Sequence, residues 1–358
     1  MKIITPLILL FFPVLLFAQM ERDTLQAISF FEEGKKWYEE RAFEKSRTPL
    51  SSAQRIYQQY ELWELFHKAT ILLHDSYLKK RQTEYVKTSI ENKLANWEVP
   101  DDKPNFYKGR YYYQLGVAAM YENASDQLLQ YAKQALALFE KSVDKSYLGD
   151  AYTLIGNYYW QTGDIEKAVQ FREQSVRTGI ELYGESAPET IKNYSYLAMF
   201  LSRTNDLDKG IAYAKKAEQI AYKVDPEKYL IHPYEAFAGL YYYKGNYEKS
   251  LDYFRKNLAI QIKSYGAVHS EVAEQSRGIA ACLDMLGKYE EAVPYYQKNI
   301  DIHEVLFGKF HRNITASQRG IAYNYFKVGQ YKKAAEYIQT ALFTSLQLET
   351  PNDILSNP

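Results

Sequence analysis

The chain has 358 residues, with 44 lysine and arginine side chains against 44 aspartate and glutamate side chains, so its formal net charge at neutral pH is zero. A chain without surplus positive charge lacks the electrostatic footprint of a nucleic-acid or anionic-membrane binder, which argues against either as the main partner. A single cysteine excludes an internal disulfide bond, so the fold must be stabilised by packing.

The first residues, 1–18, have the features of a secretory signal peptide. Lys2 supplies a positive charge, Ile3 to Phe17 form an apolar run, and Ala18 is a small residue before the expected cut ahead of Gln19. As a helix the run would span about 22 Å, short of the roughly 30 Å hydrocarbon core of a bilayer. We therefore expect an exported chain, periplasmic or cell-surface associated, without a stable membrane span after cleavage. An uncleaved anchor is the alternative.

Residues 19–99 show a weaker helical pattern, which we interpret as degenerate helical repeats. Gly34 occupies a small-residue position in the first copy, and Pro49 is expected to make the second helix of that copy irregular. Ala69 marks another copy, and its second helix is expected to begin near residue 82 and end near residue 97. Prolines and acidic residues predict a connector over residues 99–104.

A repeat of nearly fixed length organises residues 100–348. Small residues recur in the first helix of successive copies at steps of 42, 40, 42 and 42 residues, at Gly156, Ala198, Ala238, Ala280 and Ala322. Such a period is typical of a solenoid, in which each copy buries its apolar face only against its neighbours.

Each copy predicts two helices joined by a short turn. Gly163 ends the first helix of its copy, and glycine recurs at the same offset as Gly245, Gly287 and Gly329. A copy closer to the N-terminus has Asn123 in place of this glycine. About six repeats and two degenerate copies predict about sixteen helices. A polar tail follows over residues 349–358.

These residues resemble the tetratricopeptide repeat, in which glycine follows the small residue by seven positions and alanine follows the glycine by five. The connectors Ser264 to His269 and Leu306 to His311 resemble those of the 42-residue repeats in kinesin light chains and many bacterial proteins. The resemblance implies an all-α fold, a right-handed α-solenoid of helix-turn-helix repeats. It also implies a non-catalytic scaffold that presents a concave groove to a peptide or protein partner.

In that family, the first helix of each pair lines the groove at positions two, five, nine, twelve and thirteen, counted with the small residue as position eight. Carried over copy by copy, this rule selects a mixed polar and aromatic stripe: Asn157, Trp160, Lys192, Ser195, Arg203, Glu235, Tyr242, Tyr243, Arg277, Asp284, Arg319, Tyr323 and Lys327. Tyrosine, tryptophan and arginine are frequent at binding hot spots, which suits a protein ligand. An ordinary solvated helix face is the alternative for each residue.

Two finer hypotheses concern the ligand. Chaperone-binding members of the family grip a C-terminal carboxylate with lysine and asparagine at positions five and nine. Here Thr153 stands at position five before Asn157, so that clamp is not reproduced. Arg277 and Arg319, one repeat apart, could instead receive an acidic segment.

The end of the sequence carries another resemblance. Residues 352–358 resemble the exit from the repeat array in bacterial proteins that join such repeats to a caspase-like CHAT peptidase domain. This implies that the chain is the recognition part of such a protein. The alternative function is a periplasmic sensor or input domain of an envelope signalling protein. The sequence leaves the identity of the partner and the oligomeric state open.

No arrangement of residues is typical of an active site. Cys282 is the only thiol, with His269 and His303 in adjacent predicted helices, and its surroundings resemble no peptidase motif. His67 and His74 share a helical face and could take a surface metal ion, although packed or solvated histidines are the favoured interpretation. We therefore expect no enzymatic activity, no cofactor and no metal site.

Overall fold

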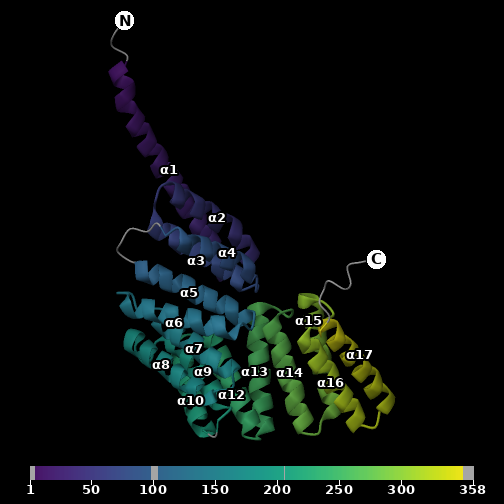
Figure 1. The fold of residues 1–358 in the computed structure, drawn as a ribbon. Coiled ribbons are helices and arrows are strands. Elements are labelled where there is room, and N and C mark those ends of the chain that lie inside the picture. Colours follow the sequence, from purple (N-terminus) through teal and green to yellow (C-terminus); the bar gives the residue numbers. More distant parts are fainter. Residues whose placement is uncertain (1–4, 98–103, 205, 350–358) are drawn as a thin grey trace, which may run out of the picture. The chain divides into compact units, whose positions relative to one another are not determined.

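The structure, a computed structural model, describes residues 5–97, 104–204 and 206–349. This described part contains 17 helices and no strand (Figure 1). The expected all-α fold is confirmed. Sixteen of the helices form eight successive pairs, and the additional one is the short α11.

The helices are α1 (Thr5–Glu39), α2 (Phe43–Gln59), α3 (Trp63–Leu78), α4 (Thr83–Ala95), α5 (Pro104–Tyr121), α6 (Ser125–Lys141), α7 (Leu148–Gln161), α8 (Ile165–Tyr183), α9 (Pro188–Leu201), α10 (Leu207–Val224), α11 (Pro226–Tyr229), α12 (Ile231–Tyr243), α13 (Tyr247–Tyr265), α14 (Ser270–Met285), α15 (Tyr289–Phe307), α16 (Arg312–Lys327) and α17 (Tyr331–Glu349).

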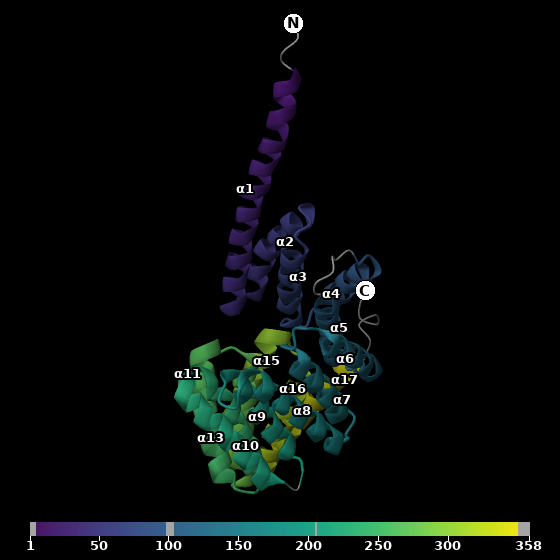
Figure 2. The same ribbon diagram turned by 90° about the vertical axis from the view of Figure 1, so that its left-hand side faces the viewer.

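The chain divides into two compact units, residues 1–178 and residues 179–358, which we call unit 1 and unit 2. In unit 1, α1 packs on α2, α2 on α3, and α5 on α6. Figure 2 shows the N-terminal half of α1 extending past α2. In unit 2, each of the pairs α9/α10, α12/α13, α14/α15 and α16/α17 packs on the next, which is the arrangement of an α-solenoid.

Left-handed residues end the first helices at the offset that the sequence predicts. Gly163 and Gly245 have φ angles of 84° and 79°, a region that glycine enters without steric cost. Asn123 occupies the same place with a φ of 57°. In the degenerate copies the left-handed residues after the first helices are larger: Arg41 follows α1 with a φ of 61°, and Arg81 follows α3 with a φ of 56°. Glu61, after the second helix α2, also has a positive φ of 54°.

The small residues allow the paired helices to approach closely. A Cβ atom added to Gly156 on α7 would lie 3.3 Å from the carbonyl oxygen of Ala168 on α8, which is closer than most side-chain contacts. In unit 2, Ala238 and Ala280 are completely buried at the corresponding positions. A larger side chain at these positions would separate the helices of a pair.

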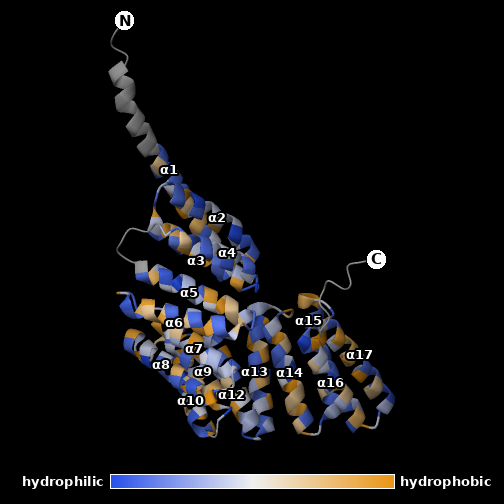
Figure 3. Ribbon diagram, viewed as in Figure 1, coloured by the Kyte–Doolittle hydropathy of each residue, from blue (hydrophilic) through white to orange (hydrophobic). Residues whose placement is uncertain are grey.

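A continuous apolar core supports the helices that carry the expected contact residues of unit 2. Leu251, Ile279, Leu283, Ile300 and Ile321 pack together from α13, α14, α15 and α16. Figure 3 shows hydrophobic and hydrophilic residues mixed along these helices, as expected for helices with one buried face. Burial of such side chains stabilises the stack by about 2 kcal/mol each.

One detail of the sequence-based prediction is wrong. Pro49 was expected to make its helix irregular, but α2 runs from Phe43 to Gln59 with Pro49 inside it. The proline ring is buried in the packed face of α2, where apolar contact offsets the missing backbone hydrogen bond.

Several other predictions lie outside the described residues. The connector over residues 99–104 and the boundary after residue 99 lie almost wholly in the undescribed segment 98–103, and residues 350–358 of the tail are also outside. Among described residues, no helix combines the length and the apolar character that a membrane span requires.

Candidate partner-binding site

The first helices of unit 2 carry most of the predicted contact residues at the surface. Seven of the predicted residues are exposed: Lys192, Arg203, Tyr243, Arg277, Arg319, Tyr323 and Lys327. Five are partly buried: Asn157, Trp160, Glu235, Tyr242 and Asp284.

The prediction for Ser195 needs correction. Its side chain is completely buried, and its hydroxyl donates to the carbonyl oxygen of Ile191 at 2.8 Å within α9. The short hydroxyl is satisfied by its own helix, so the residue can face the core rather than a partner. Lys192, three residues earlier, is exposed, and its ammonium lies 5.5 Å from the ring centroid of Tyr196.

Two predicted contact residues from adjacent repeats meet directly. Arg203 Nη1 donates to the hydroxyl of Tyr243 at 2.6 Å, and the guanidinium lies 5.4 Å from the centroid of the same ring. Tyr243 is 48% exposed, so the pair presents an aromatic face and a cation to solvent. Tyr242 instead packs against the core cluster and supports Tyr243 edge to face.

A similar arrangement occurs on α16. Tyr323 is 48% exposed, and the ammonium of Lys327 lies 5.7 Å from its ring centroid. Tyr289 on α15 meets Tyr323 edge to face at 6.0 Å, and Lys327 lies 5.5 Å from the Tyr289 centroid. Two aromatic rings and one cation therefore form a second group on unit 2, in which Tyr323 and Lys327 are exposed and Tyr289 is partly buried.

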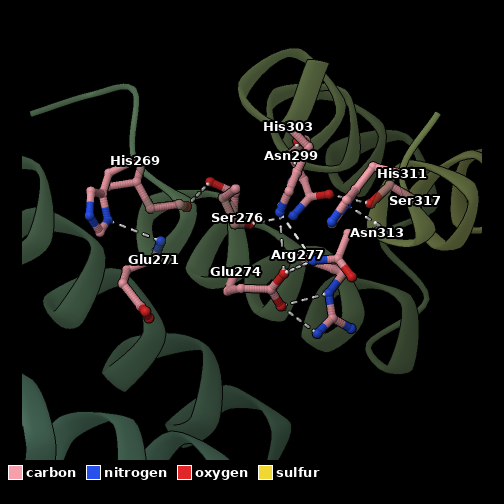
Figure 4. A network of polar contacts seen from close by, with 12 residues as sticks. His269, Glu271, Glu274, Ser276, Arg277, Asn299, His303, His311, Asn313 and Ser317 are labelled. Carbon is pink, nitrogen blue, oxygen red and sulfur yellow. Dashed lines mark hydrogen bonds and ion pairs between the residues drawn. The ribbon is translucent and has the colours of Figure 1, made fainter. Parts of the chain in front are cut away.

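A polar network joins α14, α15 and α16 around Glu274 (Figure 4). Arg277 donates from Nη2 and Nε to Glu274 Oε2 at 2.6 and 3.1 Å. Asn313 Nδ2 donates to Glu274 Oε1 at 2.8 Å and lies 3.1 Å from His303 Nε2. His303 Nδ1 lies 2.8 Å from the carbonyl oxygen of Asn299 and donates to it, which leaves Nε2 as an acceptor for Asn313.

This network changes the electrostatics expected around Arg277. Glu274 already compensates the guanidinium charge, and Glu235 and Glu271 add two further carboxylates nearby. Burial, together with the charges of Glu271 and Glu274, raises the pKa of Glu235 to about 7. This part of the surface therefore carries net negative charge when Glu235 is ionised.

Asp284 is held by the second helix of its own repeat. Its Oδ2 accepts a hydrogen bond from the hydroxyl of Tyr296 at 2.7 Å. Burial raises the pKa of Asp284, and the hydrogen bond from Tyr296 opposes that rise. Asp284 thus links α14 to α15.

In unit 1, the predicted residue Asn157 is also engaged within the fold. Arg172 Nη2 on α8 donates to Asn157 Oδ1 at 2.6 Å, and Asn157 Nδ2 lies 3.5 Å from the sulfur of Met120. Arg172 is only 4% exposed, so this interaction fixes the packing of α7 against α8.

Glu274 and Asn313 were not selected from the sequence. Glu274 stands at position two of its repeat, counted with Ala280 as position eight. Position two is one of the expected groove positions, so the same rule could have selected Glu274. Asn313 lies in the first turn of α16, outside that rule, and no local pattern indicates its contact with the preceding repeat.

The residues considered for chemistry have packing roles. Cys282 is completely buried, its Sγ lies 3.2 Å from Ser250 Oγ, and burial raises the pKa of the thiol to about 11. A thiol with a raised pKa is a poor nucleophile. His67 and His74 are 2% and 0% exposed, so both histidines are packed inside the fold. No group of three potential metal ligands occurs among the described residues.

Comparison with known proteins identifies the repeats. Models of the tetratricopeptide repeat family match residues 149–177, 229–304 and 275–342. The chain therefore carries tetratricopeptide repeats, folded as an α-solenoid. A search of curated protein sequences found no match.

Solved structures share this fold at low sequence identity. The Rap protein complexed with Competence and Sporulation Factor aligns with a TM-score of 0.59 and 13% identity, over 90% of this chain and 98% of that one. The APC/C hetero-tetramer Cut9-Hcn1 aligns with a TM-score of 0.62 and 12% identity, over 87% of this chain and 52% of that one. Aspartyl phosphate phosphatase F from Bacillus subtilis aligns with a TM-score of 0.55 and 15% identity, over 84% of this chain and 76% of that one. Identities at this level establish the fold alone.

Proposed function

We propose that the chain is a non-catalytic scaffold that binds a peptide or protein along the first helices of unit 2. The observation that carries this proposal is the pairing of half-exposed tyrosine rings with cations on that face. Tyr243 meets Arg203, and Tyr323 meets Lys327. Large aromatic side chains beside arginine or lysine are typical anchors of protein interfaces. Two structural neighbours are described together with a partner, Rap with Competence and Sporulation Factor and Cut9 with Hcn1, which supports a binding role.

The charges on this face refine the expected partner. Because Glu274 neutralises Arg277, a ladder of Arg277 and Arg319 is a weaker receptor for an acidic segment than the sequence indicated. Arg319 and Lys327 on α16 are both exposed. An acidic group of the partner would therefore contact α16, and polar or basic groups would contact the carboxylates near Glu235.

A capture experiment with matched variants tests the proposal. The chain from Gln19 onward serves as bait for an envelope extract, beside a variant with Tyr243→Ala and Tyr323→Ala. The control variant carries Val305→Ala and Leu342→Ala, which change exposed apolar residues on second helices. The proposal requires a protein lost by the first variant and kept by the control, with helicity unchanged. Equal capture by all three chains would contradict it.

Export and the larger architecture are also part of the proposal. Lys2 and the apolar run that follows support export, and the resemblance of residues 352–358 supports a link to CHAT-type peptidases. The sensor or input role is the alternative. Mass spectrometry of the native protein tests export, because a cleaved chain would begin at Gln19 and an anchored one would retain Lys2. Co-purification with a peptidase rather than a kinase or DNA-binding protein would favour the first architecture.

A further inference from the structure

A pocket of about 310 Å³ lies in unit 1, whereas the proposed scaffold function uses residues of unit 2. Its walls come from the end of α2, the start of α3 and the end of α4. Trp63, Phe66 and Trp97 supply flat apolar surface, and Asn92 and Lys93 supply polar groups. None of the described residues that line it is acidic.

His67 is the buried polar side chain of this pocket. It is 2% exposed, and its Nε2 atom has no hydrogen-bond partner among the described residues. The ring is stacked between Trp97 and Tyr107, at centroid distances of 5.3 and 4.8 Å. The two stacking contacts fix the ring plane, and His67 is one of the residues that line the pocket.

A chain of hydrogen bonds determines which nitrogen of His67 carries the proton. Gln54 Nε2 donates to Thr70 Oγ1 at 2.6 Å, so the Thr70 hydroxyl proton is available to Tyr111. Thr70 is hydrogen-bonded to Tyr111, and burial raises the pKa of Tyr111. We therefore assign the Tyr111 hydroxyl as the donor to His67 Nδ1, which lies 2.6 Å away. This leaves the proton on Nε2, a buried donor that has no partner among the described residues.

Positive charge surrounds the aromatic walls. Lys93 Nζ lies 5.5 Å from the ring centroid of Phe66, and Lys108 Nζ lies 4.7 Å from that of Trp97. Burial lowers the pKa of Lys93, and its ammonium donates a hydrogen bond to Ser89 Oγ at 3.2 Å. Burial and the charge of Lys93 lower the pKa of His67 to about 4, so the imidazole is a neutral donor at physiological pH. A partly desolvated ammonium beside a neutral N–H donor is suited to an anion.

We propose that this pocket binds a carboxylate joined to a flat apolar group, with the carboxylate between His67 Nε2 and Lys93 and the apolar group against Trp63 and Phe66. The pocket volume accommodates one such group. The same chemistry occurs in a free aromatic acid and in the last residue of a peptide that ends in phenylalanine or tryptophan.

Calorimetric titration of the full chain tests this site with two probes of equal shape. N-acetylphenylalanine carries the carboxylate, and its amide does not. We expect the acid to bind about 10-fold more tightly than the amide, because a charge-assisted hydrogen bond is lost with the charge. Lys93→Met should reduce this preference to about 2-fold or less, and Lys93→Arg should retain most of it. Thermal unfolding of each variant establishes that the fold is intact.

A peptide probe distinguishes the two possible sources of the carboxylate. A peptide Gly-Gly-Gly-Phe that binds at least as tightly as the acid identifies a polypeptide terminus as the source, whereas binding of the small acid alone identifies a free aromatic acid. Equal binding of acid and amide would overturn the proposal. So would an unchanged preference in Lys93→Met, or the absence of acid binding at millimolar concentration.

Discussion

Arg203 Nη1 lies 2.6 Å from the hydroxyl oxygen of Tyr243, although the two residues belong to adjacent repeats. Both side chains are exposed, so solvent weakens the hydrogen bond and the cation–π contact. Their coupling free energy in a double-mutant cycle with Arg203→Met and Tyr243→Phe should be about 0.5 kcal/mol. The measurement is urea unfolding of the four chains. A coupling above about 2 kcal/mol would mean that the pair is a structural link between repeats rather than a surface available to a partner.

Asn299 and Asn257 occupy equivalent positions on α15 and α13, 42 residues apart, and both are completely buried. Asn299 Nδ2 donates to the carbonyl oxygen of Ala273 at 2.8 Å, and its Oδ1 accepts from Ser317 Oγ at 2.8 Å. Neither side-chain polar atom of Asn257 has a partner among the described residues.

Replacement of each asparagine by leucine should therefore have different effects. Asn299→Leu leaves the buried Ser317 hydroxyl without its partner and removes a second hydrogen bond from the Ala273 carbonyl, so it should lower the free energy of unfolding by about 2 kcal/mol. Asn257→Leu removes unpaired polar atoms and should change it by less than about 1 kcal/mol, or raise it. Chemical denaturation of both variants provides the comparison. Equal losses of unfolding free energy in the two variants would contradict the conclusion that Asn299 is hydrogen-bonded and Asn257 is not.

Glu235 should make stability depend on pH near neutrality. Its pKa in the folded chain is about 7, above the ordinary value of 4.5, because of burial and the charges of Glu271 and Glu274. A carboxyl with a raised pKa binds its proton more tightly when folded, so the folded chain loses stability as pH rises from about 4.5 to about 7.

Glu235→Gln should therefore match the parent chain at pH 4 and be more stable at pH 8, by about 1–2 kcal/mol for a partly buried group. Urea unfolding at the two pH values measures this difference. Glu248→Gln, an exposed glutamate on α13, is the control and should show no such change between the two pH values. A stability difference for Glu235→Gln that is independent of pH would contradict the account.

Glu61 provides a test of the turn geometry. It is exposed and has a φ of 54°, where a side chain costs about 1 kcal/mol relative to glycine. Glu61→Gly should therefore raise the free energy of unfolding by roughly 0.5 kcal/mol once the greater chain entropy of glycine is included. Gly245→Ala, at a φ of 79°, should lower it by about 1 kcal/mol. Thermal unfolding compares the stabilities of the two variants. If Glu61→Gly and Gly245→Ala changed the stability in the same direction, positive φ would not be the source of strain in these turns.

The parts of the fold that depend on local periodicity could be predicted from the sequence. Ala238 and Ala280 recur at the position where helices approach closely, and Asn123 replaces glycine where the chain turns with positive φ. Asparagine tolerates this conformation better than most residues, which explains why the pattern survives the substitution.

The candidate site was less predictable because it depends on which side chains pair across repeats. A positional rule gives the helical face of Arg277 but not its rotamer, which directs the guanidinium to Glu274. Ser195 follows the same rule and is buried, because a hydroxyl bonded within its own helix is small enough for the core. The tautomer of His67 depends on contacts from α2, α3 and α5, which no sequence pattern specifies.

Site-specific photo-crosslinking tests the central claim most directly. A benzophenone amino acid is placed at Tyr243 or Tyr323 on the face of the first helices, and at Val305 on α15 as a control with 72% exposure. Our account predicts that the same protein is crosslinked from positions 243 and 323 in cells, and that it is not crosslinked from position 305. Crosslinking from position 305 alone, or of unrelated proteins from all three positions, would contradict binding along the first helices of unit 2.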